Sequence, residues 1–173
     1  TANVPSRFVN FPFEYHHEVE IIIETLTNRG WGIGRAPVQD RKWVVMVPNV
    51  IPGERVVVRI FRNFNSYSEA DLVEIVEASP DRIEALCKLS SECGGCQLQH
   101  MTIQAQRQWK QQSVEESLRE FGLTDVTIEP TVGTEHVHKY RSKLTPHFQA
   151  PAKRRRSGLP TADAMMIEAI GFQ

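Results

Sequence analysis

The run Glu54-Arg-Val-Val-Val-Arg-Ile-Phe-Arg62 has the composition of a β-strand and, over part of its length, the alternation of one. Val56, Val58 and Ile60 recur at every second position, and arginines occupy positions around them. Because successive side chains of a strand point to opposite faces, this run predicts a strand with an apolar face and a positively charged face.

Similar apolar runs lie on both sides of this strand, at Glu18–Leu26, Trp43–Val47 and Leu72–Val76. Pro52-Gly53 is typical of the centre of a type II turn, and the glycines of residues 30–34 indicate a second turn. Short strands at this spacing predict a small closed or partly closed barrel over residues 18–79. Residues 1–17 carry prolines and aromatics without a clear period, and we interpret them as a loosely ordered lead-in.

Residues 80–123 are predicted to be a connector that ends in a helix. The helix is expected over Thr102–Phe121, which lacks glycine and proline, and Gly122 is well placed to end it. Val114, Leu118 and Phe121 share one face at helical spacing, which predicts an apolar stripe.

Residues 124–173 are predicted to open a second β domain, with β-like runs at Val126–Ile128, Tyr140–Phe148 and Met165–Phe172. A Pro/Arg/Ser-rich loop is expected over residues 150–164. The chain starts at Thr1 and stops on an apolar run, so we expect it to be a piece of a longer polypeptide. The predicted fold class is α+β, mostly β.

Composition excludes several classes of protein. With 40% hydrophobic residues in 173, the chain can bury a core, so disorder throughout is not expected. No apolar run approaches the length of a membrane span, and no secretory signal opens the chain, so we predict a cytoplasmic protein without membrane contact. Organellar and nuclear locations stay open for a eukaryotic source.

The net charge of −1 conceals two basic segments. Residues 29–62 contain seven Lys/Arg against two acidic residues, and residues 139–156 contain seven Lys/Arg and no acidic residue. Such segments are typical of phosphate-binding surfaces, although a solvated face of mixed charge has the same composition. RNA or DNA is the partner that this distribution favours.

Three cysteines lie within ten residues, in the pattern Cys87-x5-Cys93-Gly-Gly-Cys96. An odd, tightly clustered set is poor material for disulfides, whereas thiolates bind soft and borderline metals. Iron–sulfur clusters and structural zinc sites need four ligands, so one is missing from this run. The candidates are His100, His136, His138 or a cysteine beyond Gln173. An iron–sulfur cluster, a zinc site with a histidine, and three free thiols all remain open on spacing alone.

The cysteine run and the four residues after it, Cys87-x5-Cys93-Gly-Gly-Cys96-Gln-Leu-Gln-His100, closely resemble a known signature. It is the iron–sulfur signature of the TRAM-containing RNA (uracil-5-)-methyltransferases. Other segments fall in the order of that family, namely Gly30–Arg35, Val47–Glu54, Ser79–Arg82, Tyr140–Lys143 and Ile170–Phe172. The resemblance covers Glu18–Phe172, and the insertion near residues 150–164 is the main departure from it.

The resemblance implies that residues 18–79 are a TRAM domain, an OB-like RNA-binding barrel, and that 124–173 begin a central β domain. It implies that Cys87, Cys93 and Cys96 hold a [4Fe–4S] cluster whose fourth cysteine lies beyond this chain. The implied activity is S-adenosylmethionine-dependent formation of 5-methyluridine in ribosomal or transfer RNA. The catalytic domain would lie outside the chain, which would therefore contain no catalytic residue and be inactive alone. We expect a monomer whose partners are RNA and the remainder of the methyltransferase polypeptide.

The candidate RNA-binding residues fall into three groups: Arg35, Lys42, Arg59 and Arg62 on the barrel, Gln99 and His100 beside the cysteines, and Tyr140, Arg141 and Lys143 downstream. Trp31 and Trp43 could stack on bases, but we favour a core position for Trp43. Lys153–Arg156 is interpreted as a solvated loop, with an RNA-binding or nuclear-targeting patch as the alternative.

Three other functions compete with this interpretation. A stand-alone RNA-binding TRAM module with a metal would never methylate, and a zinc-bound interaction module would be colourless. A radical S-adenosylmethionine enzyme would need a C-x3-C-x2-C motif, which the observed spacing argues against. A Rossmann loop at Gly30-x-Gly-x-Gly34 is disfavoured because this segment opens no predicted helix.

Overall fold

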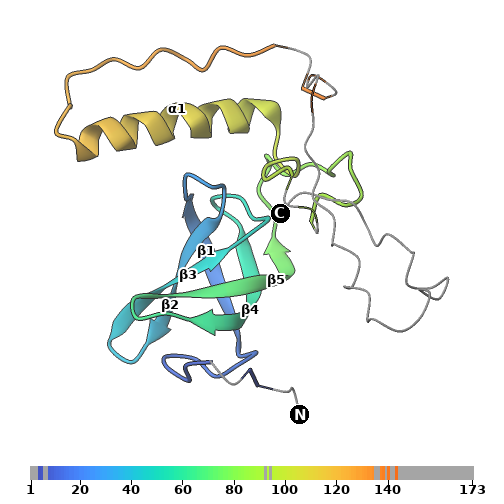
Figure 1. Cartoon of the computed structure of the whole chain (residues 1–173), viewed down its shortest axis with the longest axis vertical. Coiled ribbons are helices and arrows are strands. Elements are labelled where there is room, and N and C mark those ends of the chain that lie inside the picture. The colour runs from blue at the N-terminus through green and yellow to red at the C-terminus, as the bar shows by residue number, and fades with distance from the viewer. Residues whose placement is uncertain are drawn as a thin grey trace, which may run out of the picture.

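The fold is a small closed β-barrel with one helix lying across an end of it (Figure 1). A computed structural model describes residues 4–5, 8–91, 93, 95–134, 137–138, 140 and 143. The strands are β1 (Glu18–Leu26), β2 (Gly32–Val38), β3 (Arg41–Val47), β4 (Arg55–Asn63) and β5 (Tyr67–Glu77), and the helix is α1 (Ile103–Glu120). The mostly β class predicted from the sequence is confirmed.

The strands close in the order β1-β2-β3-β5-β4, with β4 pairing back onto β1. All pairs are antiparallel except β3 with β5, which run parallel. A five-stranded barrel of short strands is the architecture of OB-like RNA-binding domains. Closure matters for stability because it leaves no sheet edge unpaired within the barrel.

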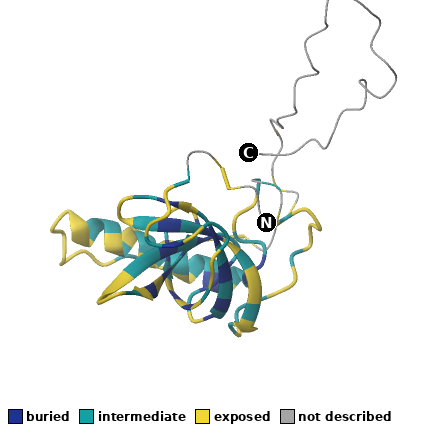
Figure 2. Cartoon of the chain, turned by 90° about the horizontal axis from the view of Figure 1, so that it is seen from below, coloured by how far each residue is buried: buried dark blue, intermediate teal, exposed yellow. Residues whose placement is uncertain are grey.

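The barrel core is formed by buried residues from all five strands. Figure 2 shows buried residues in dark blue along the strands of the barrel. On β4 the apolar face predicted from the sequence, Val56, Val58 and Ile60, is fully buried. The turn before β4 is also as predicted, because Gly53 has a φ of 87° and the Glu54 amide donates to the Ile51 carbonyl at 3.2 Å.

Strand β2 corrects the prediction of a turn over residues 30–34. Only Gly30, with a φ of 78°, serves a turn, whereas Gly32 and Gly34 lie inside the strand and are buried. A Cβ on Gly32 would lie 2.2 Å from Val50 Cγ2, and one on Gly34 would lie 2.7 Å from the Ile22 carbonyl oxygen. These two glycines therefore permit close packing between barrel segments.

Part of the lead-in is fixed to the barrel, which corrects the expectation of loose order for the described residues 8–17. Phe13 is buried in the barrel core. The buried Asn63 side chain fixes this segment, because its Nδ2 donates to the carbonyls of Val9 and Phe13 at 2.6 and 2.7 Å. Its Oδ1 accepts from Ser68 Oγ at 2.6 Å, and Ser68 Oγ accepts from Trp43 Nε1 at 2.9 Å.

Asn63→Ala is expected to lower the free energy of unfolding by about 2–4 kcal/mol, because it leaves several buried polar groups without partners. Urea unfolding of the full chain measures this change. Asn65→Ala is the matched control, since Asn65 is exposed at the β4–β5 turn and should change stability by less than about 0.5 kcal/mol. Equal effects of the two changes would contradict the anchoring of the lead-in by Asn63.

The helix begins and ends as the sequence indicates. Thr102 Oγ1 accepts from the Ala105 amide at 3.3 Å as an N-cap. At the other end Gly122 has a φ of 79°, and the Leu123 amide donates to the Leu118 carbonyl at 3.0 Å, which is a Schellman motif.

The apolar stripe predicted on the helix is wrong in position. Val114 is 49% exposed and Phe121 is 83% exposed. Instead, the first half of α1 packs on the barrel end through Ala105 and Trp109, in a second cluster with Leu26, Ile51, Leu98 and Met101. The buried and partly buried apolar contacts of α1 with the barrel end thus come from its N-terminal half.

The segment after the helix runs back along α1 without strand pairing in the part of the chain that the structure describes (Figure 1). The strand expected at Val126–Ile128 is therefore not found, because these residues contact the helix rather than another strand. Gln111 Nε2 donates to the Ile128 carbonyl at 3.2 Å, and Thr131 Oγ1 donates to the Arg107 carbonyl at 2.9 Å. The remaining predictions for residues 144–173, including the Lys153–Arg156 loop, lie outside the described residues.

Candidate nucleic-acid interface and metal centre

The three cysteines lie on the connector between β5 and α1. Cys87 and Cys96 are exposed and Cys93 is half-buried, and none of the three forms a disulfide. Backbone turns shape this loop: the Ser90 amide donates to the Cys87 carbonyl at 3.0 Å, and the Cys93 amide donates to the Leu89 carbonyl at 2.8 Å. The connector therefore presents three accessible thiols from one short stretch.

The thiols of Cys87, Cys93 and Cys96 are donors of the type that a metal centre requires. Free, accessible thiols are the ligands that iron–sulfur clusters and structural zinc use. Among the described residues, however, no three His, Cys, Asp or Glu side chains are grouped closely enough to hold a metal ion. The chemistry of the donors thus fits a thiolate-held centre, while their present arrangement does not form one. Glu92, Gly94 and His136 lie outside the described residues.

A buried ion pair clasps the connector to the barrel. Glu54, fully buried at the start of β4, receives hydrogen bonds from Arg82 Nε at 2.6 Å and from Arg82 Nη2 at 2.8 Å. The same carboxylate accepts from the Ile51 amide at 2.8 Å and from the Ser79 amide at 3.2 Å. Arg82 Nη2 also donates to the Asn49 carbonyl at 2.9 Å. Sequence reasoning missed this pair, although both residues stand in segments that it quoted.

His100 corrects a predicted role. It was a candidate for contact with RNA, but its ring is 9% exposed and lies against the barrel, with Nε2 3.3 Å from the Val50 carbonyl oxygen. Burial lowers the pKa of this histidine, although the contact with Val50 and the nearby Glu54 carboxylate act in the opposite direction. His100 therefore packs the connector onto the barrel.

The pKa of Glu54 is lowered even though its burial acts to raise it. The hydrogen bonds from Arg82 and from the amides of Ile51 and Ser79, with the charge of Arg82, outweigh burial. Because the unfolded chain then binds more protons than the folded chain, the stability that Glu54 contributes is present above its unfolded pKa and is lost as the pH falls through its folded pKa.

Acidification from neutral pH is therefore expected to destabilise the protein in a limb that begins near the ordinary glutamate pKa of about 4.3 and extends below it. Glu54→Gln should be less stable at pH 7 and should lose this limb. Thermal unfolding as a function of pH measures both effects. Glu20→Gln, which removes a half-exposed carboxylate 3.7 Å from Arg55, should retain the limb. An unchanged pH profile in Glu54→Gln would contradict the argument.

The four barrel cations predicted to bind RNA do not form one free patch. Arg35 is paired with Glu24, and Arg59 lies 3.9 Å from Asp71. The strand register explains this, because Arg59 stands opposite Asp71 on β5. Arg62 is exposed with its guanidinium 4.6 Å from the centre of the Phe64 ring. Lys42 is exposed on β3, and no ion pair to it is found among the described residues.

The two tryptophans considered for base stacking, Trp31 and Trp43, differ in their burial. Trp43 packs against the barrel core, as favoured, and Trp31 is half-buried. Phe64 and Tyr67 were missed, although a Phe-Asn-Ser-Tyr turn after a basic strand was visible in the sequence. Their rings stack with centroids 4.4 Å apart.

The remaining RNA-binding predictions are placed as follows. Gln99 Oε1 accepts from the Cys87 amide at 3.1 Å, so Gln99 supports the cysteine loop directly. Tyr140 is 66% exposed and Lys143 is also exposed, whereas Arg141 lies outside the described residues.

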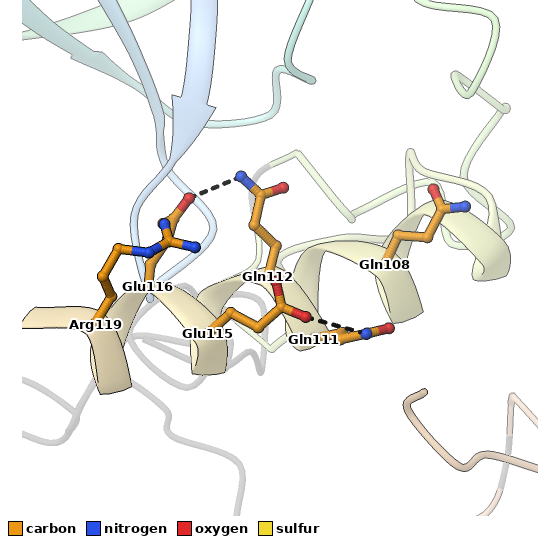
Figure 3. A pocket seen from close by; sticks show the side chains of 6 residues that line it. All are labelled: Gln108, Gln111, Gln112, Glu115, Glu116 and Arg119. Atoms are coloured by element: carbon orange, nitrogen blue, oxygen red, sulfur yellow. Dashed lines mark hydrogen bonds between the residues drawn. The ribbon is translucent and has the colours of Figure 1, made fainter. Parts of the chain in front are cut away.

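A shallow polar hollow runs along α1 (Figure 3). Its side chains bond one another: Gln111 Nε2 donates to Glu115 Oε1 at 3.1 Å, and Gln112 Nε2 donates to Glu116 Oε1 at 2.7 Å. These pairs satisfy the helix surface and assemble no reactive group. Among the described residues, no helix is long enough and apolar enough to cross a membrane.

The sequence is similar to a protein family and to several curated proteins. Residues 6–73 match the TRAM domain family, so the match begins in the lead-in and covers most of the barrel. The chain is 36% identical over 149 residues to an uncharacterized RNA methyltransferase of Halalkalibacterium halodurans, covering 86% of this chain and 31% of that protein. It is 34% identical over 148 residues to the tRNA (uracil(54)-C(5))-methyltransferase of Schizosaccharomyces pombe, covering 82% of this chain and 28% of that protein.

Most of the barrel thus matches the TRAM domain family, and the chain is similar to proteins named RNA methyltransferases, as the resemblance predicted. A further relative, an uncharacterized RNA methyltransferase of Clostridium acetobutylicum, is 35% identical over 136 residues, covering 77% of this chain and 29% of that protein. The chain thus spans less than a third of the length of these curated relatives.

Proposed function

We propose that this chain is the RNA-binding and cluster-holding part of an S-adenosylmethionine-dependent RNA uracil-5-methyltransferase. The main support is that the buried Glu54–Arg82 pair joins a barrel matching the TRAM family to a three-cysteine connector. The chain is also similar to proteins named RNA methyltransferases. The buried pair supports the proposal because it holds the cysteine loop in a defined position beside an RNA-binding fold.

The proposed substrate is a uridine in transfer or ribosomal RNA, and the name of the Schizosaccharomyces pombe relative supports uracil C5 as the methylated atom. Methylation at C5 requires a nucleophile that adds at C6 and a base that removes the C5 proton. The three cysteines of this chain are assigned to a metal centre, so these catalytic groups are proposed to lie in other parts of the protein. This chain contributes by binding and orienting the RNA.

In this proposal Cys87, Cys93 and Cys96 hold a [4Fe–4S] cluster with a fourth cysteine from elsewhere in the protein. Such a cluster, when bound, supplies a rigid cross-link between the segments that carry its ligands, and methyl transfer needs no net electron from it. Gln99 holds the Cys87 amide, and the Glu54–Arg82 pair holds the start of the connector. These residues would keep the cysteine loop at the barrel end.

Deletion of the coding sequence in the source organism tests the proposal. Mass spectrometry of purified ribosomal and transfer RNA should show the loss of 5-methyluridine from one of the two fractions, restored by the wild-type gene. Undiminished 5-methyluridine in both fractions would overturn the uracil-5 assignment. Loss of a different methylated nucleoside would move the protein to another class of RNA methyltransferase.

A further inference from the structure

The hairpin between β4 and β5 carries a stack of one cation and two aromatic rings on its outer surface. The Arg62 guanidinium carbon lies 4.6 Å from the centre of the Phe64 ring. The Phe64 and Tyr67 rings are stacked with centroids 4.4 Å apart and an angle of 16° between their planes. The Phe64 amide donates to the Tyr67 carbonyl at 2.8 Å, which closes the turn that presents the two rings.

The stack faces outward. Ser68 and Ala70 of β5 are buried, so by strand alternation the Tyr67 side chain points to solvent, and both rings are in fact only partly buried. Tyr67 stands opposite Val44 of β3, which in turn stands opposite Arg35 of β2. The rings thus continue a surface that crosses three strands.

The charge around the stack suits a nucleic acid only locally. Three other arginines of the barrel strands are matched by acids: Arg35 pairs with Glu24, Arg55 lies 3.1 Å from Glu77, and Arg59 lies 3.9 Å from Asp71. Arg62 lies against the Phe64 ring, and Lys42 precedes by two residues Val44, the register partner of Tyr67. Both cations are exposed, and within the described residues no ion pair to either is found. Glu69 stands opposite Arg62 in the register, so the local positive field is modest. Stacking, more than charge, must then supply affinity at this place.

Stabilisation of the hairpin is the competing explanation for the stack. The hairpin is already fixed from inside the barrel by Asn63, Ser68 and Trp43, which bond one another at 2.6 and 2.9 Å. Among the described residues, the hydrogen bonds of that network join Trp43, Ser68 and Asn63 and involve neither outer ring. Two stacked aromatics beside an exposed arginine at a turn have the composition of a base-stacking platform.

We propose that Phe64 and Tyr67 form a stacking platform for an unpaired base of RNA, with Arg62 and Lys42 contacting the adjoining phosphates. This inference rests on the proposed RNA-binding function and adds to it the class of RNA, which is single-stranded at this contact. In a duplex the bases are stacked on one another, so no base face would be accessible to the two rings. The hairpin lies at the end of β4 opposite to Glu54, and therefore away from the cysteine connector.

The test measures binding of the full chain to fluorescently labelled RNA by anisotropy. The variant Phe64→Leu/Tyr67→Leu keeps apolar volume but removes both aromatic faces. It should weaken binding of a single-stranded oligonucleotide by about tenfold or more, since base–aromatic stacking is worth about 1–3 kcal/mol per base. Binding of duplex RNA should not change. Tyr67→Phe keeps the ring and should bind as the wild type does.

Two controls separate stacking from folding and from charge. Phe121→Leu removes an aromatic that is 83% exposed at the end of α1, and it should bind normally. An oligonucleotide with abasic sites should bind the wild type as weakly as it binds the platform variant, because no base is present to stack. Arg62→Gln should instead lower the dependence of log affinity on log salt concentration by about 0.7, the contribution of one phosphate contact on a single strand.

The outcomes distinguish this inference from the proposed function. If the wild type binds single-stranded RNA and the platform variant binds equally well, the platform is wrong and the proposed function stands. If the variant loses duplex and abasic RNA to the same extent as intact single strands, the change acts through the fold and the platform is again wrong. If the wild type binds no RNA, both are overturned. Circular dichroism of the variant establishes that it is folded, and single Phe64→Leu and Tyr67→Leu variants replace it otherwise.

Discussion

Replacing Arg82 with methionine is expected to lower the free energy of unfolding by about 3–5 kcal/mol, because it leaves a buried carboxylate without its counter-charge. Glu54 is fully buried and accepts two hydrogen bonds from the Arg82 fork. Two amide donors, from Ile51 and Ser79, would remain, but they cannot replace a positive charge. Urea unfolding of the full chain, followed by tryptophan fluorescence, measures the change.

The control for Arg82 is another arginine in a weak pair. Arg59 lies 3.9 Å from Asp71, and both side chains are about half exposed to solvent. Arg59→Met should change stability by less than about 1 kcal/mol. Arg82→Lys should fall between the two, since lysine keeps the charge but loses the two-pronged geometry. Similar small losses in Arg82→Met and Arg59→Met would show that the buried pair does not hold the connector.

The double variant Glu54→Met/Arg82→Met separates the cost of an unpaired charge from the value of the pair. Removal of both partners of a buried pair is often neutral or stabilising. The double variant should therefore recover much of the stability lost in Arg82→Met. If it is instead less stable than Arg82→Met, the pair itself contributes net stability to the clasp.

Local patterns in the sequence predicted the elements whose side chains alternate. The bounds of β1 are those expected, Glu18–Leu26, because apolar residues at every second position, Val19, Ile21 and Ile23, mark its inner face, whereas Ile22 between them is exposed. Strand β2 was missed because Gly32 and Gly34 look like turn residues. Their function, to let Val50 and Ile22 approach, depends on chain segments that only the fold brings near.

Long-range partners explain most of the other corrections. Phe13 is buried because Asn63, 50 residues later, bonds its carbonyl, and no period in the lead-in signals this. The clasp joins Glu54 to Arg82 across 28 residues. The basic face of β4 was visible in the sequence, but its neutralisation was not, because strand register decides that Arg59 meets Asp71.

The metal-ligand prediction depends least on the fold, since all its residues lie in one loop. Replacing Cys93 with serine is expected to remove nearly all bound iron and sulfide, together with the visible absorbance, from the protein isolated without oxygen from its natural source. The serine hydroxyl is a hard, protonated oxygen, whereas iron–sulfur clusters are held by thiolates. Cys93 is the central cysteine of the three, so its loss should prevent assembly.

Ser91→Ala is the matched control, because Ser91 is exposed in the same loop and is not a predicted ligand. The barrel should stay folded in both variants, since the core cluster that contains Val45 and Val58 includes no residue of the cysteine loop. An unchanged urea midpoint, followed by tryptophan fluorescence, checks this. Retained colour in Cys93→Ser would exclude Cys93 as a ligand. A colourless wild type with one zinc per chain would replace the cluster by a zinc site, and the connector would then be an interaction module whose fourth ligand is a histidine or a further cysteine.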